Sequence, residues 1–443
     1  MDIAIALILS AAMLLFVIFK GMFIGYMLIF SYICFFAVCL YREYSIKQIF
    51  QISWNSSKNS LIVIQIFMLI GAIIGIWFAS GTIPTMVYYA LSYLNPNIFL
   101  MLCFIICAAT SFLIGTCFGT CSVMGVPLMI IAIAGSANIP MTAGAIVCGA
   151  YFGDRMSFMS GSAILVATVT KTEVRTNMKN MLKTAIVPTL LTLIYFYYIS
   201  RYSILNSIDS ALQSEIAIQF NASLILLIPA LVVLIMAIIG LGIKKAMICS
   251  IAVSAILTIL IQKHNIFETL RYIVLGFSLG EEASLSKVMR GGGIVSMLKP
   301  ALVIFVSTSL TGLLTRLQIM DGVKQKISKF NYKRHSLFFM TVVISTIASM
   351  VGCNQSISII MTNDVMKDIY EKHVSLPSEA LAVDMENSSV ILAGMIPWSI
   401  AALVPATTLG VTPFEFMPYA FFVWILPIYY FGSIFVKNKV NSN

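Results

Sequence analysis

The sequence PMTAGAIVCGAYFGDRMSFMSGSAILVATVT, residues 140–170, contains one acid and one base, Asp154 and Arg155, in an otherwise uncharged run. At ~1.5 Å per helical residue, Asp154 lies on the order of 20 Å from Pro140 and about 25 Å from Lys171, the next charge after Arg155. A carboxylate at the middle of a bilayer costs ~2.5 kcal/mol or more, so such an acid usually marks an ion or proton pathway. The alternative is a charge pair that reaches an interface or closes a structural salt bridge.

Small and hydroxyl residues surround this charge pair. They weaken helix continuity and leave backbone carbonyls and hydroxyls free to face a cation. We therefore expect a broken helix near Asp154, with hydroxyls as candidate neutral ligands. The residues concerned are Gly149, Gly153, Ser157, Ser160, Gly161 and Ser162.

Composition sets the class of protein. The chain of 443 residues is 60% hydrophobic and 10% charged, with many apolar runs long enough to cross a ~30 Å hydrocarbon core. The net charge of +10 sits in short connections between apolar runs, where it sets membrane orientation and implies no nucleic acid partner. We predict an all-α polytopic membrane protein with about 11–13 transmembrane helices, and expect spans at 3–19, 22–40, 60–79, 98–115, 184–200, 217–238, 246–262, 300–315, 336–351, 389–404 and 416–435.

Cysteine and histidine give no sign of a bound cofactor. The nine cysteines lie in apolar segments and the three histidines are scattered, so no cluster has the spacing of zinc or iron–sulfur ligands. We interpret the cysteines as small buried hydrophobic residues and expect no cofactor.

An internal repeat divides the chain. One constant shift of the numbering, without gaps, places Gly75 on Gly312, Gly115 on Gly352 and Pro140 on Pro377. The connection at 80–97 carries no charge, whereas its counterpart at 316–334 is strongly basic. Because basic connections stay in the cytoplasm, the two copies should have opposite orientations, as in the inverted repeats of secondary transporters. The predicted units are an N-terminal helix pair at 1–57, repeat 1 at 58–200, connecting helices at 201–297 and an inverted repeat 2 at 298–443.

A second interrupted region, 352–388, should contain half-helices or re-entrant hairpins and supply the partner chemistry. Glu386 precedes an apolar run, so we expect it to be buried and titrating, whereas Asp384 should be solvated. For the amides in this region, hydrogen bonding between helices is as good an interpretation as cation binding. The mixed-sign cluster Glu281, Glu282, Lys287, Arg290 is typical of a solvated turn. The candidate ligands here are Asn354, Gln355, Glu386, Asn387 and Ser389.

Three motifs resemble the NhaC-type Na+/H+ antiporter family from about residue 60 onward. They are GTCFGT at 115–120, MTAGAIVCGAYFGDRMS at 141–157, and a late pattern formed by Glu386, Asn387, Ser389, residues 396–399 and residues 418–422. The resemblance implies a cation/proton exchanger, with relatives that exchange malate or lactate. This chain departs from the family pattern at three acids, which appear here as Gly161, Asn354 and Asn387.

We therefore expect a Na+/H+ antiporter in the plasma membrane, in which Na+ and protons compete for Asp154 and Glu386. The alternative is a Na+- or H+-coupled exchanger of a small organic anion or an amino acid, with Arg155 holding the substrate carboxylate. An intramembrane aspartyl hydrolase would need two opposed catalytic carboxylates and a peptide cleft, and we expect no enzyme. A homodimer is left open.

Overall fold

The computed structural model describes residues 2–20, 22–23, 25–58, 60–93, 95–202, 210–220, 222–279, 289–317, 324, 327, 332–372 and 376–440. Within these residues the chain is almost entirely helical, apart from a two-stranded antiparallel ribbon. Its strands, β1 (Phe277–Ser278) and β2 (Arg290–Gly291), pair Phe277 with Gly291 and Ser278 with Arg290. Most of the predicted turn around Glu281 lies outside the described residues.

The N-terminal half contains the following helices: α1 (Asp2–Phe19), α2 (Gly25–Tyr41), α3 (Ile46–Lys58), α4 (Leu61–Ala79), α5 (Thr82–Tyr93), α6 (Phe99–Ile114), α7 (Cys117–Thr120), η2 (Cys121–Gly125), α8 (Val126–Ala134), α9 (Ile139–Arg155), α10 (Gly161–Thr170), α11 (Val174–Ser200) and α12 (Ser210–Phe220). The C-terminal half contains α13 (Ile228–Ile238), α14 (Ile243–Leu260), α15 (Ile266–Leu275), α16 (Leu298–Arg316), α18 (Arg334–Gly352), α19 (Gln355–Glu371), α20 (Glu379–Glu386), α21 (Ser389–Leu392), α22 (Ile400–Leu409), α23 (Pro413–Phe416) and α24 (Phe421–Val440). Short 3-10 turns are η1 (Pro96–Ile98), η3 (Leu224–Leu227), η5 (Ile294–Met297), η6 (Ala393–Met395) and η7 (Met417–Tyr419).

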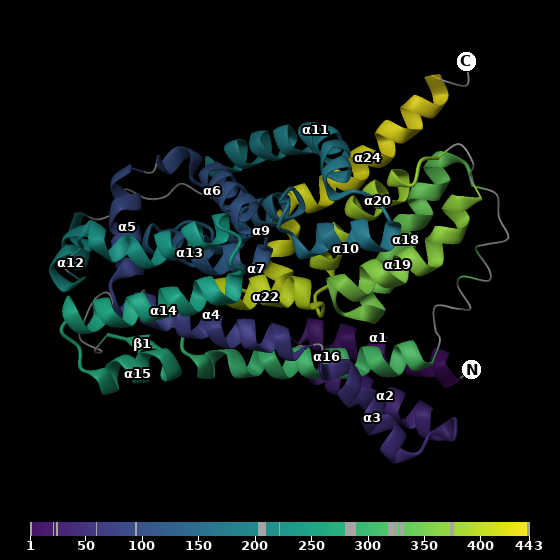
Figure 1. Ribbon diagram of the computed structural model, residues 1–443, viewed down its shortest axis with the longest axis horizontal. Helices are drawn as coiled ribbons and strands as arrows, with labels where there is room; N and C mark the ends of the chain where they lie inside the picture. The colour runs from purple at the N-terminus through teal and green to yellow at the C-terminus, as the bar shows by residue number, and fades with distance from the viewer. Residues whose placement is uncertain are drawn as a thin grey trace.

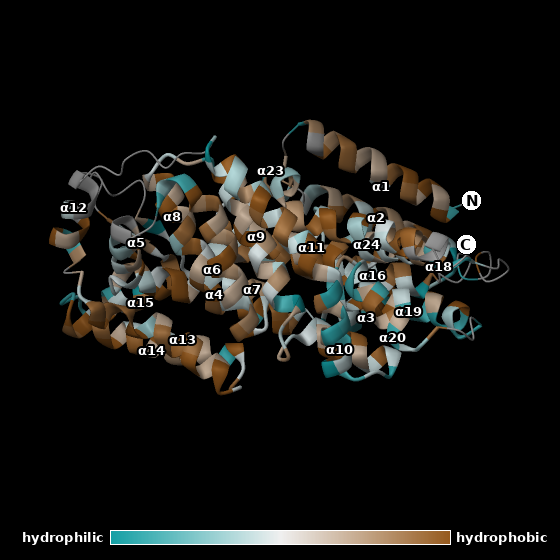
Figure 2. Ribbon diagram, turned by 90° about the horizontal axis from the view of Figure 1, so that it is seen from above, coloured by the Kyte–Doolittle hydropathy of each residue, from teal (hydrophilic) through white to brown (hydrophobic). Residues whose placement is uncertain are grey.

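The predicted class, an all-α polytopic membrane protein, is confirmed. In the described part of the chain, seven helices are long and apolar enough to cross a membrane, or up to nine if each of two bent pairs is one span. Shorter apolar helices add to them at Asp2–Val17, Gly25–Tyr41, Gly161–Thr170 and Leu224–Ile238. Hydrophobic residues run along α1, α13 and α14 (Figure 2).

Several predicted boundaries are wrong. The uncharged connection at 80–97 contains a helix, α5, and the predicted span at 389–404 is broken, with its two parts bent by 52°. The span predicted at 184–200 begins earlier, at Val174, so Arg175, Lys179 and Lys183 lie on α11 and not in a connection. Long basic side chains can stay in a spanning helix because their charged ends reach the interface.

The helix bounds bear on the repeat. The shift that places Gly75 on Gly312 also places both ends of α4 on the ends of α16, and nearly the same shift places both ends of α10 on the ends of α22. Ser160 and Ser399 cap the latter two helices in the same way, each accepting a hydrogen bond from a backbone N–H of the first turn. The repeat itself, the relative orientation of its two copies and the predicted domain limits stay predictions.

The interrupted helices α9–α10 and α20–α21 lie near each other in the molecule. Helices α10, α18, α19 and α20 gather beside α24 at one end of the molecule, whereas α5, α12 and α13 lie at the other (Figure 1). Helix α9 connects these regions and packs along α6. The last turn of α9 therefore meets the helices of the second broken region.

Close packing fixes α9 in place. Asn138 caps its first turn by accepting a hydrogen bond from the Met141 N–H at 3.0 Å. Gly149 and Gly153 face α6, where an added Cβ would overlap the carbonyl oxygens of Phe104 and Ala108. Small residues at this spacing let two membrane helices approach closely. The glycines therefore set the position of Asp154, the residue after Gly153.

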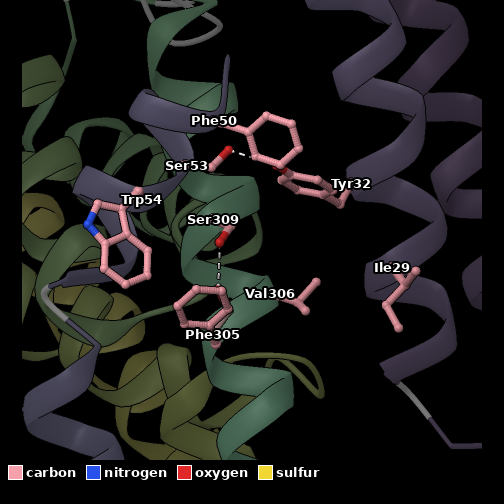
Figure 3. A pocket seen from close by; sticks show the side chains of 8 residues that line it. All are labelled: Ile29, Tyr32, Phe50, Ser53, Trp54, Phe305, Val306 and Ser309. Carbon is pink, nitrogen blue, oxygen red and sulfur yellow. Dashed lines mark hydrogen bonds between the residues drawn. The ribbon is translucent and has the colours of Figure 1, made fainter. Parts of the chain in front are cut away.

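A separate N-terminal layer packs on α16. Tyr32 of α2 and Ser53 of α3 are hydrogen bonded through their hydroxyls at 2.9 Å, and Ser57 of α3 bonds Ser309 of α16 at 2.5 Å. A cavity of 300 Å³ with an apolar lining lies between these three helices (Figure 3). The segment before α4 thus contains a third helix, α3, in addition to the predicted pair.

Candidate functional site

The sequence around Asp154 forms the expected broken helix. Helix α9 ends at Arg155 and α10 begins at Gly161, with residues 156–160 between them. Asp154 is 8% exposed and Arg155 is 1% exposed. The predicted burial of this charge pair within apolar helices is confirmed.

Hydroxyl groups line the break. The hydroxyl of Ser160 lies 2.9 Å from that of Ser162, and it also accepts the Ala163 N–H at 3.3 Å. The hydroxyl of Ser157 accepts the Met159 N–H at 3.3 Å. All three serines are buried. They supply oxygen atoms within a few residues of Asp154, as the sequence predicts.

A second helix break, between α6 and α7, lies near Asp154. Helix α6 ends at Ile114, and Gly115 follows it with a φ of 72°, a left-handed conformation that glycine adopts without strain. The chain resumes as α7, and Cys117 at its start and Ser160 both interact electrostatically with the Asp154 carboxylate. The first N–H groups of a helix have no partner within it and attract negative charge. This start of α7 was not identified from the sequence as part of the site.

Glu386 lies in the other broken helix. It is the last residue of α20, and Asn387 and Ser388 separate it from α21. Glu386 and Asn387 are completely buried, and neither carboxylate oxygen of Glu386 has a hydrogen-bond partner among the described residues. The expected burial of Glu386 is therefore confirmed. A buried carboxylate without a partner is unfavourable unless it binds a proton or another cation.

Arg155 joins the two breaks. One guanidinium nitrogen, Nη2, donates to Oδ1 of Asn387, and it lies 3.4 Å from the Thr184 hydroxyl on α11. Its Nε and Nη1 have no partner among the described residues, where no ion pair within 4.0 Å joins Arg155 to Asp154 or Glu386. The alternative of a closed salt bridge at Arg155 is thus not what the described residues form.

The three charges nevertheless act on one another. Glu386 interacts electrostatically with both Arg155 and Asp154. Two ionised carboxylates and one guanidinium sum to −2 + 1 = −1. Because a net charge is costly in an apolar interior, the cluster favours the uptake of one monovalent cation or one proton.

Ser389 belongs to a buried network of hydroxyl groups. It lies 2.9 Å from Ser358, which in turn lies 2.7 Å from Ser349. Ser345 and Ser388 form a neighbouring pair at 3.0 Å. The serines of α18 and α19 were missed in the sequence analysis. Ser345 and Ser349 are four residues apart in an apolar helix, a spacing that places both on one face and could have identified them.

Asn354 and Gln355 lie beside this network and bond to the backbone. The Asn354 side chain caps α19 by accepting the Ser356 N–H at 2.8 Å. The Gln355 side chain donates to the carbonyl of Val390 at 2.8 Å. The Gln355 contact joins α19 to α21, as the interpretation of hydrogen bonding between helices expects, whereas the Asn354 contact lies within the start of its own helix. Their predicted role in cation binding stays a prediction.

The expectation that Asp384 is solvated is wrong. Asp384 is completely buried and accepts two hydrogen bonds from Arg334, each at 2.6 Å. The hydroxyls of Tyr370 and Tyr430 also donate to it. The polar residues near Asp384 in the sequence suggested exposure to solvent. In the structure, however, α20 directs Asp384 toward Arg334, the first residue of α18. This acid is fully paired.

The positions of the missing family acids differ in their surroundings. Gly161 is exposed at the start of α10, and an added Cβ would have no neighbour within 4 Å. Asn387 is buried against Arg155, and Asn354 is half-buried at the cap of α19. Gly161 is therefore the position at which an acid could be added with the least steric disturbance.

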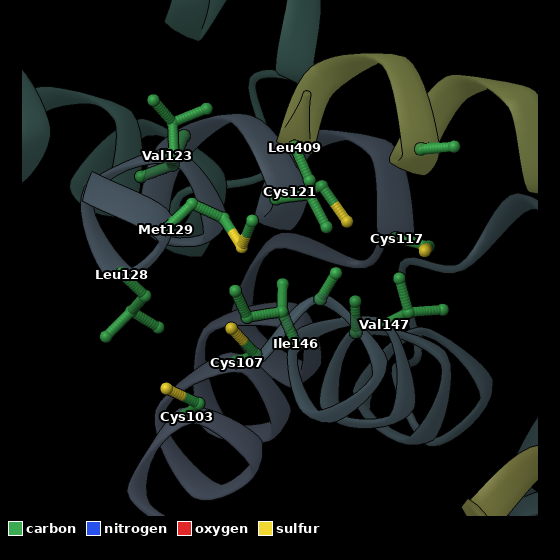
Figure 4. Close-up of a cluster of buried hydrophobic side chains, with 14 of the residues drawn as sticks. Cys103, Cys107, Cys117, Cys121, Val123, Leu128, Met129, Ile146, Val147 and Leu409 are labelled. Atoms are coloured by element: carbon green, nitrogen blue, oxygen red, sulfur yellow. The ribbon is translucent and has the colours of Figure 1, made fainter. Parts of the chain in front are cut away.

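Seven of the nine cysteines are buried, as predicted, whereas Cys34 is half-buried and Cys249 is exposed. Cys103, Cys107, Cys117 and Cys121 are buried where α6 and α7 cross α9, near Val123, Met129, Ile146 and Leu409 (Figure 4). All nine cysteines are free. Within the described part of the chain, no group of three or more His, Cys, Asp or Glu residues is arranged to hold a metal ion.

Membrane-spanning helices with breaks that bring buried charges together define a secondary active transporter. Residues 149–437 match the model of the Na+/H+ antiporter family, and the chain belongs to that family. The predicted family and the predicted class of transporter are confirmed. The protein is a multi-pass integral membrane protein of a transporter family rather than an enzyme family.

Three curated relatives illustrate the range of the match. The "Malate-2H(+)/Na(+)-lactate antiporter" of Bacillus subtilis is 30% identical over 392 residues, covering 86% of this chain and 82% of the relative. The "Na(+)/H(+) antiporter NhaC" of the same organism is 29% identical, covering 86% of this chain and 85% of the relative. The "Arginine/ornithine antiporter ArcD" of Halobacterium salinarum is 22% identical, covering 87% and 81%.

Proposed function

We propose that this protein exchanges Na+ for protons across the plasma membrane, and that Asp154 and Glu386 are the groups for which the two ions compete. One observation carries the proposal: two buried carboxylates and one arginine meet at the breaks of two helices, with a net charge of −1 when all are ionised. Such a cluster is neutralised equally by one Na+ or by one proton. Membership of the Na+/H+ antiporter family supports these ions.

In this mechanism the ionised Asp154 binds Na+ together with hydroxyl oxygens of Ser157, Ser160 and Ser162. Hard oxygen ligands of this kind suit a small alkali cation. Protonation of Asp154 removes its charge and releases Na+ on the side where protons are more concentrated. Glu386 is the second proton acceptor. The positive charge of Arg155 offsets one of the two carboxylates, so the ionised site attracts one net positive charge.

The two helix pairs provide the means of alternating access. We infer that 58–200 and 298–443 are two related units, because their helices α4 and α16 and their half-helices α10 and α22 correspond at both ends. In transporters built from inverted repeats, the substrate site lies at the interface of the units, and one unit rocks against the other. Asp154 from the first unit and Glu386 from the second would then be exposed alternately to each side.

Exchange of a small organic anion is the second candidate. Arg155 has two nitrogens, Nε and Nη1, without a partner among the described residues, and a guanidinium binds a carboxylate through paired hydrogen bonds. The relative at 30% identity is named as an antiporter of malate and lactate. In this alternative Arg155 binds the substrate carboxylate, while Asp154 and Glu386 bind the coupling ions.

Transport in proteoliposomes tests both candidates. The purified protein is reconstituted with a pH-sensitive dye inside, and Na+, Li+ or K+ is added outside, followed by lactate, malate or amino acids. We expect Na+ alone to raise the internal pH, because entry of Na+ drives protons out. A pH change that appears only when an organic anion is present would replace the first candidate with the second.

A further inference from the structure

A groove of 590 Å³ lies beside the site, between α6, the end of α9 and the first turns of α11. Its lining is apolar except for two cations of α11, Arg175 and Lys179. Phe152 and Met156 line it as well, and they flank Asp154 and Arg155 in the sequence. The groove is therefore amphipathic, and its apolar part touches the turn that carries the charge pair.

The apolar part faces outward. Phe112 is 45% exposed, Phe158 is 57% exposed and Leu182 is 52% exposed. These side chains belong to segments at membrane depth, where the surrounding solvent is hydrocarbon. A small soluble anion finds no polar partner along this wall. A hydrocarbon chain fits it.

Arg175 and Lys179 lie at the depth in the membrane where lipid headgroups are found. Arg175 and Lys179 are four residues apart, so they lie about 6 Å apart along one face of α11. Helix α11 has 27 residues, about 40 Å, which exceeds the ~30 Å hydrocarbon thickness, so its first turns extend toward the interface. This end of the chain segment carries Lys171, Arg175, Lys179 and Lys183 against one acid, Glu173, and this basic excess places it in the cytoplasm by the positive-inside rule.

Both cations are available to a ligand. Arg175 and Lys179 are exposed, and the described residues offer neither of them a carboxylate within 4.0 Å. The nearest acid on the same segment, Glu173, accepts a hydrogen bond from the Thr176 hydroxyl. Basic pockets between membrane helices on the cytoplasmic side are suited to anionic headgroups.

We propose that this groove binds an anionic phospholipid of the bilayer. The phosphate lies on Arg175 and Lys179, and an acyl chain occupies the wall formed by Phe112, Phe158 and Leu182. The lipid thereby contacts Phe152 and Met156, next to the charge pair. The transported ions do not enter this site, so lipid binding does not depend on the proposed function.

Native mass spectrometry of the full chain in detergent tests the proposal, with phosphatidylglycerol and phosphatidylcholine titrated separately. Each cation near a charged surface contributes about fivefold in affinity. The Arg175→Gln/Lys179→Gln protein should thus bind phosphatidylglycerol about 25-fold more weakly than the wild type. The matched control is Lys263→Gln/Lys372→Gln, which removes the same charge from two exposed positions outside the groove.

A second variant tests the binding of the acyl chain separately from the binding of the headgroup. Ala109 is exposed and lines the groove, so Ala109→Phe narrows the apolar wall without removing a charge. It should weaken the binding of phosphatidylglycerol while soluble glycerol phosphate remains a poor competitor. Equal binding of both lipids to the wild type, or unchanged binding in the double variant, would overturn the proposal. Strong competition by glycerol phosphate would also overturn it, in favour of a site for soluble anions.

Discussion

Two buried clusters of arginine and acid lie in this protein, and they differ in one respect. Arg334 and Asp384 form a closed cluster. Arg334 donates two hydrogen bonds of 2.6 Å to the carboxylate, and two tyrosine hydroxyls donate to its oxygens as well. Arg155, Asp154 and Glu386 form an open cluster, in which N–H groups of Arg155 and both carboxylate oxygens of Glu386 are buried without a partner among the described residues. A closed cluster holds helices together and has no free group to offer an ion. The open cluster has that capacity, which is why we assign transport to it.

The largest effect is expected from Asp154→Asn, which keeps the size of the side chain and removes its charge. Exchange should fall more than tenfold because neither Na+ nor a proton can then be exchanged at this position. The measurement is Na+-driven pH change in proteoliposomes containing equal amounts of folded protein. Asp368→Asn is the matched control, since Asp368 is exposed and pairs only with Lys324 in the described part of the chain. If the Asp154→Asn protein exchanged ions at the wild-type rate, the open cluster would have a structural role and not a role in transport.

The closed cluster should respond in stability. Asp384→Asn leaves the half-buried charge of Arg334 without its partner, and breaking such a pair costs at most about 3–5 kcal/mol in the free energy of unfolding. Thermal unfolding in detergent measures the loss.

A double replacement, Arg334→Met with Asp384→Leu, serves as the control because it removes both charges. It should recover much of the stability lost in the single variant. If the double variant is stable but inactive in the transport assay, the closed cluster also takes part in exchange, and the contrast between the two clusters fails.

The two clusters also show what the sequence could predict. Asp154 and Glu386 were identifiable because each stands beside small or polar residues within long apolar runs. The opposite environments of Asp384 and Glu386 were not, because they depend on where Arg334 lies, far earlier in the sequence. Likewise, the motif around Cys117 gave no sign that Cys117 interacts with Asp154. Apolar runs predict helices, whereas contacts between distant helices require the fold.

A smaller effect is expected for Glu386→Gln. If both carboxylates must be ionised to bind Na+, exchange declines on the acid side with a slope of about two in a plot of log rate against pH. Removing one titrating group should reduce this slope to about one, while the rate at the optimum falls less than tenfold. The pH–rate profile of the reconstituted protein provides the test. An unchanged slope would show that Glu386 does not compete for protons during exchange.

The smallest effect is expected from adding an acid, and it separates the two proposed functions. Gly161→Asp places a carboxylate in open space seven residues from Asp154, so the fold should accept it. At roughly 10 Å, with an effective dielectric constant of about 80 to 20, an extra charge contributes about 0.4–1.7 kcal/mol. For a Na+/H+ antiporter, the Na+ concentration at half-maximal exchange should fall a few-fold, because the added charge attracts the cation. For an exchanger of organic anions, the same charge should repel the substrate from Arg155 and depress its uptake with every cation supplied. Measuring Na+-driven proton flux and anion uptake in the same vesicles distinguishes these results, and Gly161→Asn controls for the added bulk.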